Sequence, residues 1–168
     1  MALSYCNPIQ NKLLASLPFT VRQRLLPSLE QCTLPLGKVL CQSSEPIHHV
    51  YFPTDAVVSL FYVTMEGQST EVSVIGNDGV VGITQVLRGD STNTRAVVQI
   101  AGNAYRLPSH VVTAEFDHHT ELMTISLRYL QVLMTQMVQT AVCNRHHNLE
   151  QQLCRLLPCP VSGTGIQS

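Results

Sequence analysis

The chain has 168 residues, of which 45% are hydrophobic and 12% charged, and its formal net charge at pH 7 is −1. The length suits one compact domain with an appended element, and the near-neutral charge excludes the basic face with which a protein follows a nucleic-acid backbone. No apolar run approaches the roughly 20 residues that cross a bilayer, and residues 1–10 lack the features of a secretory signal, so we expect a cytoplasmic protein with no membrane contact.

The first expected elements are helical. Residues 9–29 carry apolar positions three and four apart, which is the spacing of one helix face. Pro18 and Pro27 interrupt this spacing, because proline inside a helix removes a backbone hydrogen bond. The segment therefore predicts two short helices with a break near Pro18.

Between Cys32 and Leu107 the pattern changes to short runs rich in Val, Ile, Tyr and Phe, which is typical of β-strands. Four groups of turn residues separate these runs, and we interpret them as hairpin-like turns: residues 36–38, 53–55, 66–68 and 101–103. Roughly six to eight short strands predict an antiparallel roll or barrel, which is the closed arrangement for such a set. The pattern does not favour a helix in this region.

Helical spacing returns at Ser109. It predicts a short helix over residues 109–116 and a long helix from about Thr120 to Leu157, a stretch without Gly or Pro. Thr120 and Glu121 suit the first turn of the long helix. At a rise of 1.5 Å per residue this helix would be about 55 Å long. It therefore cannot bury its whole length against the domain that precedes it.

The apolar stripe of the long helix predicts a partner. A parallel pair of such helices about a two-fold axis would cover the stripe. A charged fraction well below the usual value of about a quarter also indicates that part of the surface is covered. We expect homodimer contacts from six residues of this helix: Leu127, Leu130, Met134, Met137, Val138 and Ala141.

The order of elements is helices, a β-roll, a short helix and then a long helix. This order resembles the cyclic-nucleotide-binding-like domain of Crp/Fnr transcription regulators, and the resemblance covers about residues 10–157. Five segments carry it: residues 37–40 (GKVL), 50–52 (VYF), 76–82 (GNDGVVG), 94–98 (TRAVV) and 149–155 (LEQQLCR).

The resemblance implies an α+β fold, in which an antiparallel double-stranded β-roll, a cyclic-nucleotide-binding-like jelly roll, is flanked by short N-terminal helices and a long C-terminal dimerisation helix. It divides the chain into a sensor domain over residues 1–119, the dimerisation helix over 120–157 and a disordered tail over 158–168. In this family a winged helix-turn-helix follows the long helix. Residues 158–168 are too few to form it, so we expect the DNA-reading domain to be absent.

Nucleotide-binding members of the family hold the cyclic phosphate with a glycine-containing loop and short helix. An arginine on the next strand pairs with the phosphate, and a glutamate after the last glycine binds the ribose. By this resemblance, five residues of the chain would line a ligand pocket: Gly79, Gly82, Ile83, Thr94 and Arg95.

The chain departs from this scheme at several positions. Ile83 stands where the family has its glutamate, and it cannot accept a hydrogen bond. Arg95 directly precedes Ala96, one residue closer than in the family, so strand alternation points it to the opposite face unless a bulge in residues 88–93 restores it. Asp78 adds a negative charge. We therefore expect no tight binding of cyclic AMP, and another small effector or none in the pocket.

The main hypothesis is a non-enzymatic, homodimeric sensing module in which a ligand shifts the long helices. One alternative is a ligandless interaction module that forms mixed dimers with full-length relatives and fills its pocket with Ile83. A metal-dependent enzyme on the same roll would need His and carboxylate ligands, which the strands do not offer. Cys143, His146 and His147 share a helix face, but such polar faces are usually solvated, so we predict no metal and no cofactor.

Overall fold

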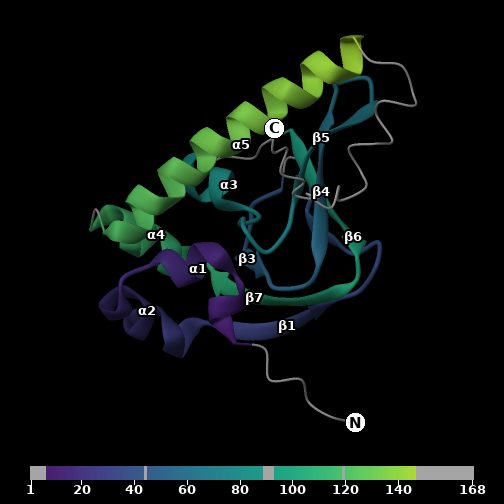
Figure 1. Cartoon of the computed structure of the whole chain (residues 1–168). Helices are drawn as coiled ribbons and strands as arrows, with labels where there is room; N and C mark the ends of the chain where they lie inside the picture. The colour runs from purple at the N-terminus through teal and green to yellow at the C-terminus, as the bar shows by residue number, and fades with distance from the viewer. Residues whose placement is uncertain (1–6, 44, 89–92, 119, 147–168) are drawn as a thin grey trace, which may run out of the picture.

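The computed structural model describes residues 7–43, 45–88, 93–118 and 120–146, and two antiparallel sheets form its centre (Figure 1). The N-terminal elements are η1 (Pro8–Gln10), α1 (Lys12–Ser16), α2 (Phe19–Leu25) and η2 (Leu26–Ser28). The strands and one short helix follow: β1 (Glu30–Leu34), β2 (Val39–Cys41), β3 (His49–Pro53), β4 (Val57–Val63), β5 (Ser69–Ile75), α3 (Ile83–Arg88), β6 (Thr94–Ile100) and β7 (Gly102–Pro108). The helices α4 (Ser109–Asp117) and α5 (Glu121–His146) come last.

The N-terminal prediction is confirmed. Two short helices, α1 and α2, are separated at the expected break, where Pro18 is the N-terminal cap residue of α2. Pro27 lies in the 3-10 turn that follows α2, where its missing N–H costs no helical hydrogen bond. Asn11 caps α1 by accepting hydrogen bonds from the backbone N–H groups of Leu13 and Leu14.

The two sheets form the expected roll. One sheet has the strand order β1-β7-β3 and the other β2-β6-β4-β5, and every pairing is antiparallel. One face of each sheet points toward the other, and aliphatic side chains such as Leu34, Val58 and Val98 fill the space between them. The predicted α+β jelly roll is thus confirmed.

The second hydrophobic cluster lies between the three-stranded sheet and the helices. Phe52 of β3 and Tyr105 of β7 are register partners on the helix-facing side, where side chains from α1, α2 and α4 cover them. Leu122 at the start of α5 joins the same cluster. Figure 1 shows these helices gathered at one end of the roll, with α5 running on past the four-stranded sheet. The three-stranded sheet therefore contributes side chains to both hydrophobic clusters, although most of β1 is exposed.

Two details of the strand region differ from expectation. Of the four predicted hairpin-like turns, the one at Gly67 closes a hairpin, between β4 and β5. The turns over residues 36–38, 53–55 and 101–103 instead carry the chain from one sheet to the other. The segment Ile83–Arg88 forms the helix α3, although the pattern did not favour a helix there.

The C-terminal helices match the prediction over the described residues. The short helix α4 covers the expected 109–116, and α5 is continuous from Glu121 to His146. Residues 147–157 of the predicted long helix and the predicted tail over 158–168 lie outside the described residues. In the part of the chain that is described, no helix has both the length and the apolar content needed to cross a membrane.

An ion pair joins α2 to α4. The guanidinium nitrogens Nε and Nη2 of Arg24 donate to the carboxylate oxygens Oε1 and Oε2 of Glu115, respectively, each at 2.7 Å. The Glu115 side chain is only 10% exposed, whereas that of Arg24 is 52% exposed. The hydrogen bond from Arg24 lowers the pKa of Glu115, and burial opposes this shift. The two-pronged geometry makes the pair more specific than a single surface contact.

The Glu115→Gln variant is expected to lose less stability in acid than the wild type. A carboxylate whose pKa is depressed by folding stabilises the folded state above its unfolded pKa of about 4.3, and this contribution disappears as the pH falls through the folded value. Urea denaturation at several pH values between about 7 and 3 measures the slope. Glu30→Gln, which removes the more exposed partner of Arg106, is the control. Equal slopes for the wild type and Glu115→Gln would contradict the assignment.

Candidate functional site

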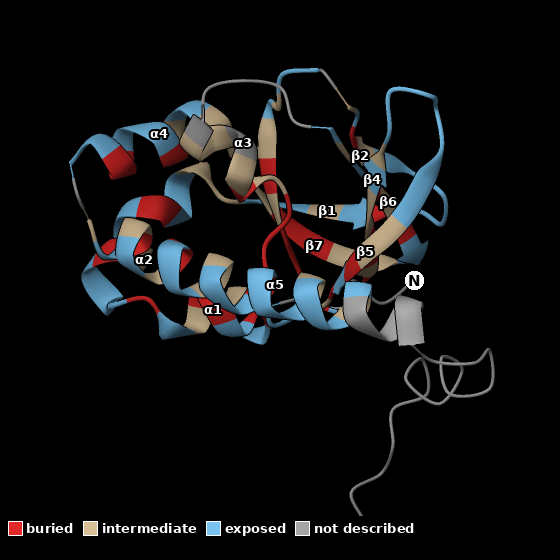
Figure 2. Cartoon of the chain, turned by 90° about the horizontal axis from the view of Figure 1, so that it is seen from above, coloured by how far each residue is buried: buried red, intermediate tan, exposed pale blue. Residues whose placement is uncertain are grey.

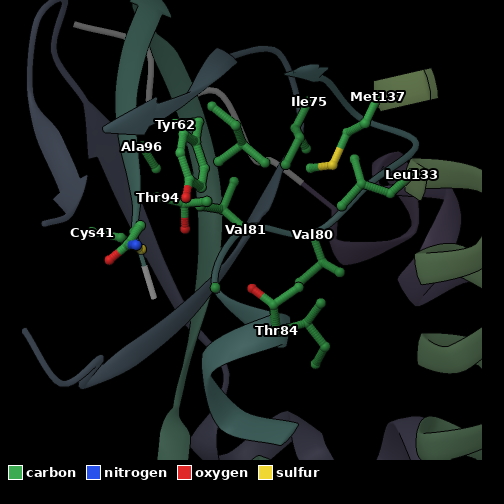
Figure 3. Close-up of a pocket in the computed structure, with 14 residues that line it drawn as sticks. Cys41, Tyr62, Ile75, Val80, Val81, Thr84, Thr94, Ala96, Leu133 and Met137 are labelled. Carbon is green, nitrogen blue, oxygen red and sulfur yellow. The ribbon is translucent and has the colours of Figure 1, made fainter. Parts of the chain in front are cut away.

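A cavity of about 450 Å³ lies between the four-stranded sheet, the segment that leads into α3, and α5 (Figure 3). This volume is within the range of small-molecule sites, about 300–1,000 Å³. The lining residues come from β2, β4, β5, β6, the segment over 80–84 and α5: Cys41, Leu60, Tyr62, Ile75, Val80, Val81, Gly82, Ile83, Thr84, Asn93, Thr94, Ala96, Leu133 and Met137.

The loop over residues 76–82 is held by hydrogen bonds to its backbone on both sides. Val81 and Tyr51 exchange two of them, with N–O distances of 2.8 and 3.0 Å. The amide Nδ2 of the buried Asn11 donates to the carbonyl oxygen of Gly79 at 2.9 Å. The loop is therefore fixed between β3 and the N-terminal helices, and it presents one wall of the cavity in a defined shape.

Three of the five predicted pocket residues lie together on the cavity wall: Gly82, Ile83 and Thr94. Gly82 has a φ of +94°, and a side chain there would also collide with that of Ile47, so this position requires glycine. Ile83 is 2% exposed and packs into the helix-facing core as well as the cavity wall. Gly79 does not line the cavity, because it is buried against α5 instead.

Arg95 does not line the cavity either. Its neighbours Thr94 and Ala96 do, and strand alternation turns the guanidinium of Arg95 to the exposed outer face of β6. The register with β4 runs without a shift from Thr94 to Ala96, so no bulge within β6 reverses this orientation. Residues 89–92, which belong to the segment 88–93 where a bulge would restore the inward orientation, lie outside the described residues.

The cavity wall is neutral. Among the described residues, those that line the cavity include no Asp, Glu, Lys, Arg or His. The polar groups are the hydroxyls of Tyr62, Thr84 and Thr94, the amide of Asn93 and the thiol of Cys41. Burial raises the pKa of Cys41 to about 12, so its thiol stays protonated near neutral pH. The site therefore offers hydrogen bonds but no counter-charge for a phosphate.

The prediction from the sequence omitted the contribution of α5 to this wall. Leu133 is 3% exposed, and together with Met137 it projects from α5 toward Ile75 and Val80 (Figure 3). Met137 was expected to contact a second chain. The predicted pocket also lacks the cavity-facing residues of β4, such as Leu60. The alternation of side chains along this strand could have identified them.

Tyr129 connects α5 to the loop. Burial raises the pKa of the Tyr129 phenol to about 12, and the backbone of Val80, which lies close to the hydroxyl, partly opposes this shift. The ring fits because Gly79 has no side chain: a Cβ there would lie 2.6 Å from the Tyr129 hydroxyl and 2.8 Å from a methyl group of Ile75. Gly79 thus allows α5 to pack directly on the loop.

Gly79→Ala is expected to lower the free energy of unfolding by about 1–3 kcal/mol, which is the usual cost of an overpacked site. Gly76→Ala is a matched control in the same loop, since a Cβ there would meet only one atom, in Asp78, at 3.8 Å. Thermal or urea denaturation measures both. If the two variants are equally stable, the steric role of Gly79 is wrong.

The six residues predicted to contact a second chain divide into two groups. Leu127, Met134 and Val138 are 47%, 66% and 63% exposed, and Ala141 is also exposed. Leu130 and Met137 are half-buried, because the helical period places them at the edge of the face that packs on the roll. Figure 2 shows the outer side of α5 exposed along most of its length.

The metal ligands considered in the sequence, Cys143, His146 and His147, belong to the C-terminal end of the predicted long helix. Within the described residues, no group of three His, Cys, Asp or Glu side chains lies close enough to hold a metal ion. The side chains of Cys143 and His146, and all of His147, lie outside the described residues.

No family model and no curated protein matches the sequence, whereas solved structures do. The c-di-GMP-responsive global regulator CLP of Xanthomonas campestris matches with a TM-score of 0.64 and 10% identity, over 83% of this chain and 70% of that one. The catabolite activator protein of Thermus thermophilus matches with a TM-score of 0.56 and 17% identity, over 85% and 62% of the two chains.

A third match is the regulatory subunit of a cAMP-independent protein kinase A from Trypanosoma cruzi, whose structure contains guanosine. Its TM-score is 0.59 and its identity 16%, over 74% of this chain. The present chain spans 46% of that subunit's length. The two antiparallel sheets and the helices of this chain match the arrangement found in these solved structures. The chain therefore has the cyclic-nucleotide-binding-like jelly-roll fold that Crp/Fnr-type regulators share.

Proposed function

We propose that this chain is the effector-sensing and dimerisation module of a Crp/Fnr-like transcription regulator, and that it catalyses no reaction. One observation carries the proposal. The helix α5 supplies Leu133 and Met137 to the cavity wall, and the same helix exposes an apolar row that includes Met134 and Val138. A ligand in the cavity and a second chain on the apolar row would thus contact adjacent faces of one helix.

This arrangement couples the two binding events. A ligand that contacts Met137 and the loop beside Tyr129 would favour one position of α5 over another. Because the apolar row moves with the helix, the geometry of a two-fold pair would change with it. In a complete regulator, such a change would be passed to a DNA-binding domain.

The proposed effector is not cyclic AMP. A cyclic phosphate in this cavity would lose its hydration without a compensating contact from Arg95, because Arg95 points outward. Ile83, in the position of the ribose-binding glutamate, supplies no acceptor. The guanosine in the Trypanosoma cruzi protein indicates that a ligand without phosphate can be held by this fold.

Calorimetric titration with cyclic AMP and cyclic GMP, together with the mass in solution, tests the proposal. We expect no binding of either nucleotide at micromolar concentrations and a dimeric mass. Micromolar binding would show that the nucleotide site is intact. A monomeric mass at micromolar protein concentration would contradict the dimerisation role. A dimer whose cavity binds no small molecule would instead favour the ligandless interaction module.

A further inference from the structure

We propose that the cavity holds a neutral, largely apolar small molecule with one uncharged polar end. The inference rests on the proposed sensing function and specifies its effector. It follows from how the polar and apolar parts of the wall are distributed.

The deep part of the cavity is aliphatic. Ile75, Val80 and Leu133 are 2%, 1% and 3% exposed, and Met137 closes the same side from α5 (Figure 3). A flexible thioether beside branched side chains adapts to an alkyl group without imposing one shape. This end therefore favours an alkyl or other hydrocarbon group, whose transfer from water is favourable over the whole buried area.

Three of the five polar side chains, those of Tyr62, Asn93 and Thr94, lie toward the opening, whereas that of Cys41 is buried. Tyr62 is 45% exposed, and Asn93 beside it in space is also exposed, since both stand where β4 and β6 reach the rim of the sheet. Thr94 is the direct register partner of Tyr62. A ligand with a hydroxyl, carbonyl or ester group could exchange hydrogen bonds here while its hydrocarbon part extends toward Leu133.

Among the described lining residues none is charged, and this disfavours charged ligands of either sign. A carboxylate or ammonium group taken into the cavity loses its hydration, and no described lining residue offers the opposite charge. The buried thiol of Cys41 remains protonated and adds no charge. The proposal therefore predicts that an alcohol binds more tightly than a carboxylate of equal chain length.

Calorimetry with hexanol, octanol and decanol, set against octanoate and octylammonium, measures this consequence on the full chain. We expect the dissociation constant to fall by about fourfold per added methylene until the cavity is full. Each ion should bind at least about tenfold more weakly than octanol. A negative heat-capacity change should accompany alcohol binding, because apolar surface is buried. Octanoate or octylammonium binding as tightly as octanol would overturn the proposal, as would no alcohol binding.

Variants separate the cavity side of α5 from its exposed surface. Leu133→Gln and Met137→Gln should each weaken octanol binding by roughly tenfold, whereas Val132→Gln, at an exposed neighbouring position, should leave it unchanged. Met137 is half-buried, so its variant keeps the test decisive if Leu133→Gln does not fold. Equal effects of Met137→Gln and Val132→Gln would place the alcohol elsewhere and refute the site.

Measuring alcohol binding and the mass in solution together distinguishes a wrong effector class from a wrong dimerisation role. A dimeric protein that binds neither cyclic nucleotides nor alcohols would refute the effector class and leave the dimerisation role intact. A monomeric protein that binds octanol through Met137 would confirm the effector class and refute the dimerisation role.

Discussion

Asn11→Ala is expected to lower the free energy of unfolding by about 2–4 kcal/mol. The Asn11 side chain is fully buried and makes four hydrogen bonds. Its oxygen caps α1, and its amide donates to the carbonyl oxygens of Pro53 and Gly79, each at 2.9 Å. Loss of a cap costs about 1 kcal/mol, and each buried carbonyl left without a donor adds about 1–3 kcal/mol before relaxation or water entry reduces the sum.

Two further variants test the cause of this loss. Asn7→Ala removes a cap of the same chemistry at an exposed position, where the Asn7 oxygen accepts from the N–H of Ile9, and it should cost less than about 1 kcal/mol. Asn11→Asp keeps the cap but removes both donors and faces a carboxylate toward two carbonyl oxygens, so it should destabilise at least as much as Asn11→Ala. Urea denaturation compares them, and similar losses for Asn7→Ala and Asn11→Ala would refute the role of burial.

Much of the fold follows from local patterns in the sequence. Helical spacing and two prolines predict α1 and α2, and alternating β-branched residues predict the strands. What these patterns do not contain is the partner of each strand. Gly37 and Gly102 mark reversals of the chain as Gly67 does, but whether the next strand pairs with its neighbour or joins the other sheet is decided by the shared core.

The helix α3 shows a second limit. It has six residues, and Ile83 and Val86 within it are β-branched, so its pattern cannot be told from that of a buried strand. Its helical state depends on tertiary contacts, since Val86 packs against the helix-facing core. Such a short helix has little stability of its own.

The site was partly predictable for similar reasons. Strand alternation alone indicates that Thr94 and Arg95 face opposite sides, and the structure places one on the wall and the other outside. The role of α5 was not accessible in this way. Leu133, Met134 and Met137 belong to one apolar stripe in the sequence, and only the angle at which α5 crosses the roll decides which of them turns inward.

Part of this apolar stripe faces the cavity and part is exposed, and the exposed part leads to the prediction with the largest effect on assembly. Met134→Glu is expected to weaken dimerisation by at least about 100-fold. Leu127, Met134, Val138 and Ala141 are spaced by seven, four and three residues, which is the repeat of a parallel helix pair. In such a pair each position meets its own copy near the two-fold axis, so a single substitution introduces two carboxylates in apolar surroundings.

Val132→Glu is the matched control for Met134→Glu. Val132 is 55% exposed, close to the 66% of Met134, but it lies on a different side of the helix from the apolar row. Sedimentation at several protein concentrations should therefore give a monomer for Met134→Glu and an unchanged dimer for Val132→Glu. The melting temperature of the wild type should also rise with concentration, and that of Met134→Glu should not. If Val132→Glu dissociates the protein instead, the partner covers another face of α5, and the link between Met137 in the cavity and the helix pair is lost.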